Sequence, residues 1–402
     1  MRIIKKFKIT LLIFFIFSNA KAGNIYEEKI DSIFSTIGGN VSCIVMSTEH
    51  GDVIYSLNPG MEMIPASVTK LVTSIVAMDV LGPDYKFKTV VYSDANVTGG
   101  VVNGNLYLKG FGDPDLYSGD ISTLAKEVAK TVRQVNGNII YDNSFLDDNY
   151  YALADYYSGD TKKQYWPYVA GINIDKNNMG GDPGFYAADL LTSELTVNGV
   201  TISGEVVSGV TPPRAVQIAE FSHSLKDVLI QMNKASDNLS AISVFKVIGA
   251  VNESPPGTLQ KGTNAVIDYM TRKGVDRNEY EILEGSGLTR YNIVTGNLFM
   301  RLLKIMYDDL KNFDMFYNSL PIAGYDGTLR KRMIGTEAER NVRAKTGSLN
   351  SVSALAGYTV SRDNELLMFY IVNNGFSGGW QHARDVQDAV CEVISSFTRK
   401  NQ

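Results

Sequence analysis

The chain has 402 residues, of which 44% are hydrophobic and 20% charged, an ordinary globular composition. This length predicts two or three packed units. Two cysteines, Cys43 and Cys391, are too few for a disulfide scaffold, and both a bond between them and two buried thiols remain open. The three histidines lie in no CxxC, HxxH or HExxH pattern, so we expect no metal site.

Residues 1–22 predict a secretory signal peptide. They begin with basic residues, continue with an apolar run over 9–17, and end in the small-x-small sequence Ala20-Lys21-Ala22. The apolar run is about half of the roughly 20 residues that a membrane-spanning helix needs. No later segment is apolar enough to span, so we expect no integral membrane span. The mature protein is expected to be secreted across the inner membrane, to a periplasmic or extracytoplasmic location.

Cleavage also changes the charge of the chain. The first 22 residues hold five Lys or Arg and no acidic residue, so the net charge moves from −5 to −10. An acidic exported protein lacks the basic surface that nucleic acid requires, and anionic lipid repels it. We therefore expect no nucleic-acid partner, and a small or extracytoplasmic one instead.

The first half of the chain predicts a strand hairpin, one helix and then a β-rich region. The hairpin pairs 41–46 with 52–57, and the helix covers 66–81, where apolar residues recur at helical spacing before Gly82-Pro83. From 86 to about 215 the chain consists of short β-rich pieces, with one helix near 121–135. This region is interpreted as an insertion.

The second half predicts helices followed by a strand pair. Helical periodicity covers 222–249, 261–273 and 295–311, and strands over 352–360 and 364–373 precede an amphipathic helix at 381–398. These elements predict one α/β domain, of residues 23–85 and 218–402, whose first and last parts pair across an inserted β-rich accessory region, 86–217.

Ser67 and Lys70 are the first candidates for chemistry. Hydrolysis without histidine or metal needs another base to activate the nucleophile, and lysine is available. Residues i and i+3 share a helix face, so Ser67 Oγ and Lys70 Nζ can meet in the first turn. The positive end of the helix dipole there stabilises a forming alkoxide and disfavours a protonated lysine. Helix capping by Ser67 is the alternative interpretation.

Short motifs are weak alone, as a second S-x-x-K at 243–246 demonstrates. It lies inside an apolar helical run, and we interpret it as packing. S-x-N occurs three times, and only Ser236-Asp237-Asn238 lies between the other motifs at a predicted helix connection. K-T-G occurs once, at Lys345-Thr346-Gly347, directly before the predicted strand pair.

In this order and context the three motifs resemble those of penicillin-binding serine DD-peptidases, and among them the low-molecular-mass class C D-alanyl-D-alanine carboxypeptidases/endopeptidases. The similarity extends to 104–116, 232–241, 284–292 (EGSGLTRYN), 320–333 and 343–358. The family usually has Asp before GSGL, whereas this chain has Glu284. The resemblance implies an α/β (α+β) fold of the penicillin-binding/β-lactamase-like transpeptidase type, with an antiparallel sheet flanked by helices.

The resemblance also implies a serine-type D-Ala-D-Ala carboxypeptidase/endopeptidase that acts on peptidoglycan stem peptides and is inhibited by β-lactams. Neutral Lys70 would take the proton from Ser67, which attacks the penultimate D-Ala. A base near neutral pH needs a lysine pKa lowered by about 3 units, through burial and a second cation such as Lys345. Ser236 would relay the proton to the leaving amine, and Asn238 would bond Lys70 or the substrate amide. No cofactor is implied.

The remaining site residues are implied in the same way. Lys345 and Thr346 would bind the terminal carboxylate, and Gly347 would let a strand-like peptide approach closely. The N–H groups of Ser67 and Ser348 would form the oxyanion hole. Asp142 lies where similar family members place an acidic residue facing the substrate side chain, with a solvated turn as the alternative interpretation.

Two other functions stay open at this point. A β-lactamase shares S-x-x-K and K-T-G, although the GSGL and DGTLR segments and the large insertion argue against it. A non-catalytic peptidoglycan-binding module could retain the same fold, but it would not need intact Ser67, Lys70 and Lys345.

Overall fold

The computed structural model describes residues 25–147 and 166–401, so the predicted signal peptide lies outside the described residues. Its first sheet is antiparallel, with the strand order β14-β15-β16-β1-β2. The strands are β1 (Asn40–Ser47), β2 (Val53–Leu57), β14 (Arg343–Leu349), β15 (Val352–Val360) and β16 (Leu366–Asn374). Cys43 of β1 pairs with Ile371 of β16, which confirms that the first and last parts of the chain come together.

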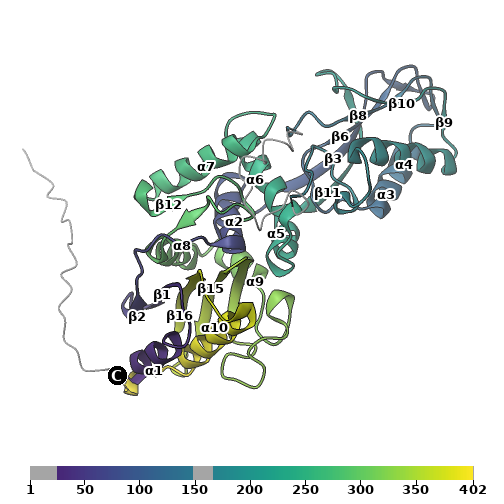
Figure 1. Ribbon diagram of the computed structural model, residues 1–402. Coiled ribbons are helices and arrows are strands. Elements are labelled where there is room, and N and C mark those ends of the chain that lie inside the picture. The colour runs from purple at the N-terminus through teal and green to yellow at the C-terminus, as the bar shows by residue number, and fades with distance from the viewer. Residues whose placement is uncertain (1–24, 148–165, 402) are drawn as a thin grey trace, which may run out of the picture.

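Helices cover both faces of this sheet (Figure 1). The apolar side chains of one face belong to the same cluster as those of α2 (Thr69–Val80), α5 (Leu225–Lys234), α6 (Asn238–Asn252), α7 (Leu259–Arg272), α8 (Gly296–Asp308) and α9 (Phe313–Ser319). The other face packs against α1 (Ile25–Phe34) and α10 (Gly379–Ser395). Alternation along β15 explains the two layers, because Ala354 and Ala356 face the first cluster and Leu355 the second.

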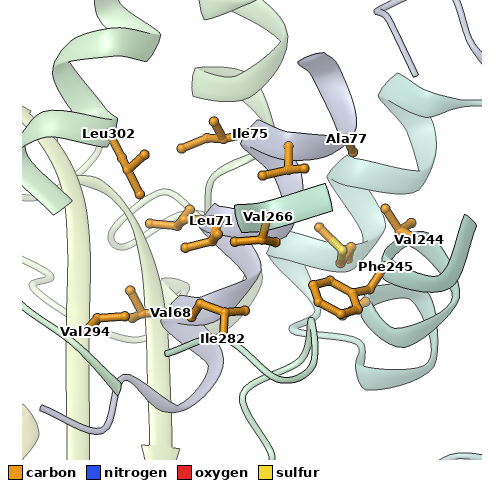
Figure 2. Packing of buried hydrophobic residues seen from close by; sticks show 14 of the residues in the cluster. Val68, Leu71, Ile75, Ala77, Val244, Phe245, Val266, Ile282, Val294 and Leu302 are labelled. Carbon is orange, nitrogen blue, oxygen red and sulfur yellow. The ribbon is translucent and has the colours of Figure 1, made fainter. Parts of the chain in front are cut away.

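Helix α2, which contains Lys70, runs through the larger apolar cluster. Figure 2 shows Val68, Leu71 and Ile75 among side chains of α6, α7 and α8. Ten of the twelve residues of α2 are buried, so the helix is enclosed nearly all round. This enclosure holds the start of α2 firmly.

The inserted region forms a second unit, which extends away from the first sheet (Figure 1). Its main sheet has the order β10-β8-β6-β3-β11. The strands are β3 (Lys86–Ser93), β6 (Leu106–Gly110), β8 (Ile139–Asp142), β10 (Val206–Ser208) and β11 (Val216–Ser224), with α3 (Ser118–Ala129) and α4 (Pro183–Val197) beside them. A smaller sheet of the unit has the order β4 (Val97–Thr98), β5 (Val101–Val102), β7 (Gln134–Val135) and β9 (Thr201–Ile202). Outside the unit, β12 (Tyr280–Glu281) pairs with β13 (Ile293–Val294).

Several element predictions were wrong. The helix predicted over 222–249 consists of the end of β11, then α5 and α6, because the backbone breaks at Ser236 with φ 58°. The insertion contains α4 as well as α3, although the β-rich interpretation of 86–215 included only one helix, near 121–135. Neither α1 nor α9 was predicted. Strand β11 continues beyond residue 217, the predicted end of the insertion, and it pairs with β3 as far as Ser224. The domain boundaries themselves stay a prediction.

Candidate active site

Ser67 lies in a single 3-10 turn, η1 (Ala66–Val68), which leads directly into α2. Lys70 Nζ donates a hydrogen bond to Ser67 Oγ at 3.0 Å, as the i, i+3 spacing predicts. Ala66 has a φ of 46°, a left-handed conformation that non-glycine residues rarely adopt. Backbone strain therefore accompanies the turn that presents Ser67.

A neighbouring glycine makes room for this turn. A Cβ on Gly287 would lie 1.9 Å from Ala66 O and 2.9 Å from Ser67 N, and Gly287 itself has a φ of 80°. Only glycine meets both requirements at this place. The GSGL segment is part of the resemblance to the family but had no predicted role, and in the structure it packs against the turn of Ser67.

Lys70 is fully buried and has three oxygen partners. Besides Ser67 Oγ, its Nζ donates to Asn238 Oδ1 at 2.8 Å and to Ser286 O at 2.7 Å. Burial lowers the pKa of Lys70 to about 8, although the negative charges of Glu284 and Asp237 oppose this change. A substantial fraction of Lys70 is therefore neutral near physiological pH, as a general base requires.

Glu284 organises the loop that contacts Lys70. Its fully buried carboxylate accepts hydrogen bonds from the N–H groups of Ser286 at 2.6 Å and Gly287 at 2.7 Å. These bonds hold Ser286 O against Lys70 Nζ. The chain differs from the usual family pattern here only in the length of the acidic side chain, and Glu284 still reaches the loop N–H groups.

Ser236 and Lys345 form the opposite side of the site. Lys345 is fully buried, and its Nζ donates to Ser236 Oγ at 2.8 Å and to Thr346 O at 2.8 Å. Burial first, and then the charge of Lys70, hold the pKa of Lys345 well below its usual range. Burial lowers the pKa of Lys70, as expected, whereas Lys345 is not among the groups that change it. The charge of Lys70 acts on Lys345 instead.

The K-T-G tripeptide directly precedes the strand pair β15 and β16, as predicted, and it lies within a further strand, β14, at the edge of the first sheet. Thr346 Oγ1 donates to Thr328 Oγ1 at 2.8 Å. A Cβ on Gly347 would lie 2.6 Å from Pro65 O and 3.1 Å from Ser67 N. The missing side chain thus lets β14 approach the turn of Ser67 closely. The sequence predicted a different role for Gly347, the close approach of a substrate peptide, and this stays a prediction. The Ser348 side chain is exposed.

Comparison with known proteins extends these observations. The model of the D-Ala-D-Ala carboxypeptidase 3 (S13) family matches residues 27–181 and 179–396, nearly the whole chain. The chain belongs to this family. The match confirms the predicted serine DD-peptidase, and the antiparallel sheet between helices agrees with the expected fold class.

Relatives of this S13 chain are similar over most of their length. A D-alanyl-D-alanine carboxypeptidase of Actinomadura sp. is 30% identical, over 92% of this chain and 84% of its own. The D-alanyl-D-alanine carboxypeptidase DacB of Haemophilus influenzae is 27% identical, over 85% of this chain and 87% of its own. A crystal structure of penicillin binding protein 4 from Haemophilus influenzae, complexed with a β-lactam, covers 90% of this chain and 98% of its own with a TM-score of 0.74 at 24% identity.

Asp142 is the one predicted residue that the S13 site does not bring together with the others. It lies in β8 of the inserted unit, fully buried, with its carboxylate 3.0 Å from Lys109 Nζ. Burial would raise the pKa of Asp142, but hydrogen bonds from Ser144 and Thr211 outweigh it and lower the pKa to about 2. With these partners the carboxylate is occupied within the unit, and its burial does not fit the solvated turn of the alternative interpretation. A contact of Asp142 with the substrate stays a prediction.

Two further predictions concern groups outside the site. Cys43 and Cys391 are both buried free thiols in the smaller apolar cluster. Across residues 25–147 and 166–401, no group of three His, Cys, Asp or Glu side chains is arranged to hold a metal ion.

Proposed function

We propose that this S13-family protein removes the terminal D-Ala from peptidoglycan stem peptides through an acyl-enzyme on Ser67. One observation carries the proposal. Two hydrogen-bonded pairs, Ser67 with Lys70 and Ser236 with Lys345, converge from three distant parts of the chain, and Asn238 joins them by bonding Lys70. This arrangement supplies a nucleophile, a base of lowered pKa and a second proton carrier without metal or histidine.

In the acylation step, neutral Lys70 accepts the proton of Ser67 while Oγ attacks the carbonyl carbon of the penultimate D-Ala. The N–H groups of Ser67 and Ser348 stabilise the oxyanion, each donor contributing about 2.7 to 4 kcal/mol in comparable sites. The C–N bond then breaks, and Ser236 passes its hydroxyl proton to the leaving amine while Lys345 Nζ, which donates to Ser236 Oγ, replaces that proton. Water then attacks the ester and gives a proton back to Lys345, and Lys70 returns its proton to Ser67 Oγ as the shortened peptide is released.

Recognition of the substrate is assigned to the edge of β14. An extended peptide can add to an edge strand through main-chain hydrogen bonds. Lys345 and Thr346 then meet the terminal carboxylate, while Gly347 keeps the strand close to Ser67. A β-lactam mimics acyl-D-Ala-D-Ala and is expected to acylate the same Ser67 Oγ.

The place of action follows from the N-terminal segment. We propose that residues 1–22 are a cleaved signal peptide and that the mature enzyme acts in the periplasm, where peptidoglycan lies. In the part of the chain that the structure describes, no helix has both the length and the apolar character needed to cross a membrane.

The test combines product analysis with active-site labelling. The protein without residues 1–22 is incubated with purified muropeptides, and the products are identified by mass spectrometry. Loss of one D-Ala from pentapeptides and penicillin attached to Ser67 are expected, with no label on Ser67→Ala. Ser243→Ala, in the second S-x-x-K, is the matched control and should label normally.

Three outcomes would contradict the proposal. An adduct on Ser243 or Ser236 would show that this serine, and not Ser67, is the nucleophile. Rapid release of hydrolysed penicillin, faster than release of D-Ala from peptide, would indicate a β-lactamase. Binding of muropeptides without any product would indicate a non-catalytic module.

A further inference from the structure

Helix α6 carries a row of polar side chains that bind the inserted unit. The row consists of Asp237, Ser240, Ser243 and Lys246, which follow one another at intervals of three and so form an oblique ridge on the helix. We call this row and its contacts the polar seam. Two residues of the seam belong to the second S-x-x-K, which the sequence analysis interpreted as packing.

The end of the polar seam that lies away from the S-x-N motif, Ser243 and Lys246, binds two loops of the inserted unit. Ser243 Oγ donates to Gly112 O at 2.6 Å, and Lys246 Nζ lies 2.8 Å from Asp147 Oδ1. Ser243 and Lys246 are almost fully buried. Buried polar groups need such partners, so these contacts fix how the unit docks on α6.

The near end of the polar seam lies at the S-x-N motif. Lys176 Nζ, from the inserted unit, lies 2.7 Å from Asp237 Oδ2 and also forms an ion pair with Asp115. Asp237 additionally accepts a hydrogen bond from Leu239 N at 3.0 Å, which caps α6. The carboxylate of Asp237 therefore joins the inserted unit to the first turn of α6.

Asp237 stands between two residues of the site. Its chain neighbours are Ser236, bonded to Lys345, and Asn238, bonded to Lys70. Ser236 has a φ of 58°, so this turn is held in a conformation that an unsupported serine rarely adopts. Moving Asp237 would move both side chains that reach the two lysines.

The segment that presents Lys176 is itself held rigidly. Asp175, Lys176 and Asn177 have φ values of 47°, 58° and 53°, three successive left-handed residues without a glycine. Asn177 ties them down, accepting from Ile174 N at 2.9 Å and donating to Tyr168 O at 2.9 Å. A strained segment with this support can hold an ammonium group in one place.

Lys176 has no donor left for a substrate. Its three N–H bonds meet four oxygen acceptors, Pro114 O at 3.0 Å, Ser240 Oγ at 3.2 Å, and the carboxylates of Asp115 and Asp237. Burial would lower the pKa of Lys176, but the two carboxylates outweigh it and raise the pKa, so the group stays charged. Its contacts are those of a support.

We propose that Lys176, held by Asp115, is a positioning residue for the reaction, which fixes Ser236 and Asn238 by holding Asp237. The inference rests on the roles proposed above for Ser236 and Asn238. It makes the inserted unit part of the catalytic apparatus, because the support for one wall of the site comes from residues 115 and 176.

The experiment compares three lysine variants of the mature protein. Lys176→Met removes the charge and keeps the length of the side chain, Lys176→Arg keeps the charge, and Lys246→Met breaks the ion pair at the far end of the seam. Lys246 lies eight residues beyond Asn238, about 12 Å along the helix, and is the matched control. Three quantities are measured: the rate constant of penicillin acylation, kcat and KM for an acyl-D-Ala-D-Ala peptide, and the melting temperature.

Lys176→Met is expected to lower the acylation rate and kcat by roughly 10- to 100-fold with KM changed less than about 3-fold, since a charge-assisted bond is lost away from the substrate. Lys176→Arg should recover acylation to within about 5-fold of wild type, because guanidinium also bridges carboxylates. Lys246→Met should lower the melting temperature while acylation stays within about 3-fold of wild type.

Two results would overturn the inference. The first is a rate constant of acylation in Lys176→Met within about 3-fold of wild type. The second is an equal loss of acylation in Lys246→Met, since the polar seam would then act through stability alone. If Lys176→Met does not fold, Asp115→Asn replaces it, and a kcat equal to wild type in that variant would also refute the proposal. Penicillin bound to Ser67→Ala would instead refute the proposed function, so the two failures are distinguishable.

Discussion

Lys70 and Lys345 are both fully buried, and burial, followed by the charge of Lys70, lowers the pKa of Lys345. Two ammonium groups in one buried site repel each other and are each costly to desolvate. Glu284 and Asp237 favour the charge on Lys70, so in the empty site a proton resides more readily on Lys70 than on Lys345. We expect a substrate carboxylate bound at Lys345, as proposed above, to shift the proton toward that lysine, because it stabilises the ammonium form.

The acylation rate should depend on pH through Lys70. Only the neutral amine can accept the Ser67 proton, and the Lys70 pKa is about 8. The rate constant is therefore expected to rise by about tenfold per pH unit on the acid side and to level off above the pKa. Stopped-flow acylation with a chromogenic β-lactam measures the profile. A rate that is constant between about pH 6 and pH 8 would contradict Lys70 as the base.

Lys70→Arg should abolish acylation although it preserves the positive charge. A guanidinium does not lose its proton in proteins, so it cannot act as a base. Fluorescent penicillin labelling followed by gel analysis measures the loss, and circular dichroism checks the fold. Lys246→Arg, the same change in the second S-x-x-K, is the control and should label normally. Labelling of Lys70→Arg within tenfold of wild type would exclude Lys70.

Lys345→Ala should act mainly on recognition of the carboxylate. Charge-assisted hydrogen bonds contribute about 1.5 to 3 kcal/mol, so acylation should fall by about 10- to 150-fold. Wild type should strongly prefer acyl-D-Ala-D-Ala with a free carboxylate over the same peptide amidated at its C-terminus. The variant should lose most of this preference while cleaving the amide almost as fast. An unchanged preference would place the carboxylate site elsewhere.

Gly347→Ala should separate β14 from the nucleophile. The new Cβ would lie 2.6 Å from Pro65 O, and overpacking of this kind costs about 1 to 3 kcal/mol. We expect a lower melting temperature and at least a tenfold slower acylation. Gly119→Ala is the control, since no atom lies within 4 Å of its Cβ position in α3. Wild-type acylation by Gly347→Ala would show that β14 need not approach Ser67.

Local patterns predicted the parts of the fold that depend on periodicity. Apolar residues at helical spacing correctly predicted the helix that contains Lys70, and those residues are buried in the structure. The same criterion failed at Ser236, where tertiary contacts impose a left-handed residue between two helices. It also failed at α4, whose first residue is Pro183 and whose later residues, Glu194 to Val197, read as strand. Propensity over a few residues is a weak guide when packing decides.

Site residues were predictable where the chemistry requires particular side chains. Ser67, Lys70, Ser236, Asn238 and Lys345 meet in space as their motifs predicted. The supporting groups were not predicted, because their function depends on contacts from distant segments. Ser286 contributes a backbone carbonyl, which any residue could supply, and Lys176 belongs to no motif.

β1 pairs with β16, although the two strands lie far apart in the sequence. β1 ends at Ser47 and β16 begins at Leu366. One neighbour of this apolar strand is therefore missing until β16 has been synthesised, and pairing over such a long sequence separation is slow. Strand β1 stays exposed to aggregation in the meantime. Penicillin labelling of nascent chains would thus report the completion of folding, because Ser67 has no sheet beside it before β14–β16 have formed.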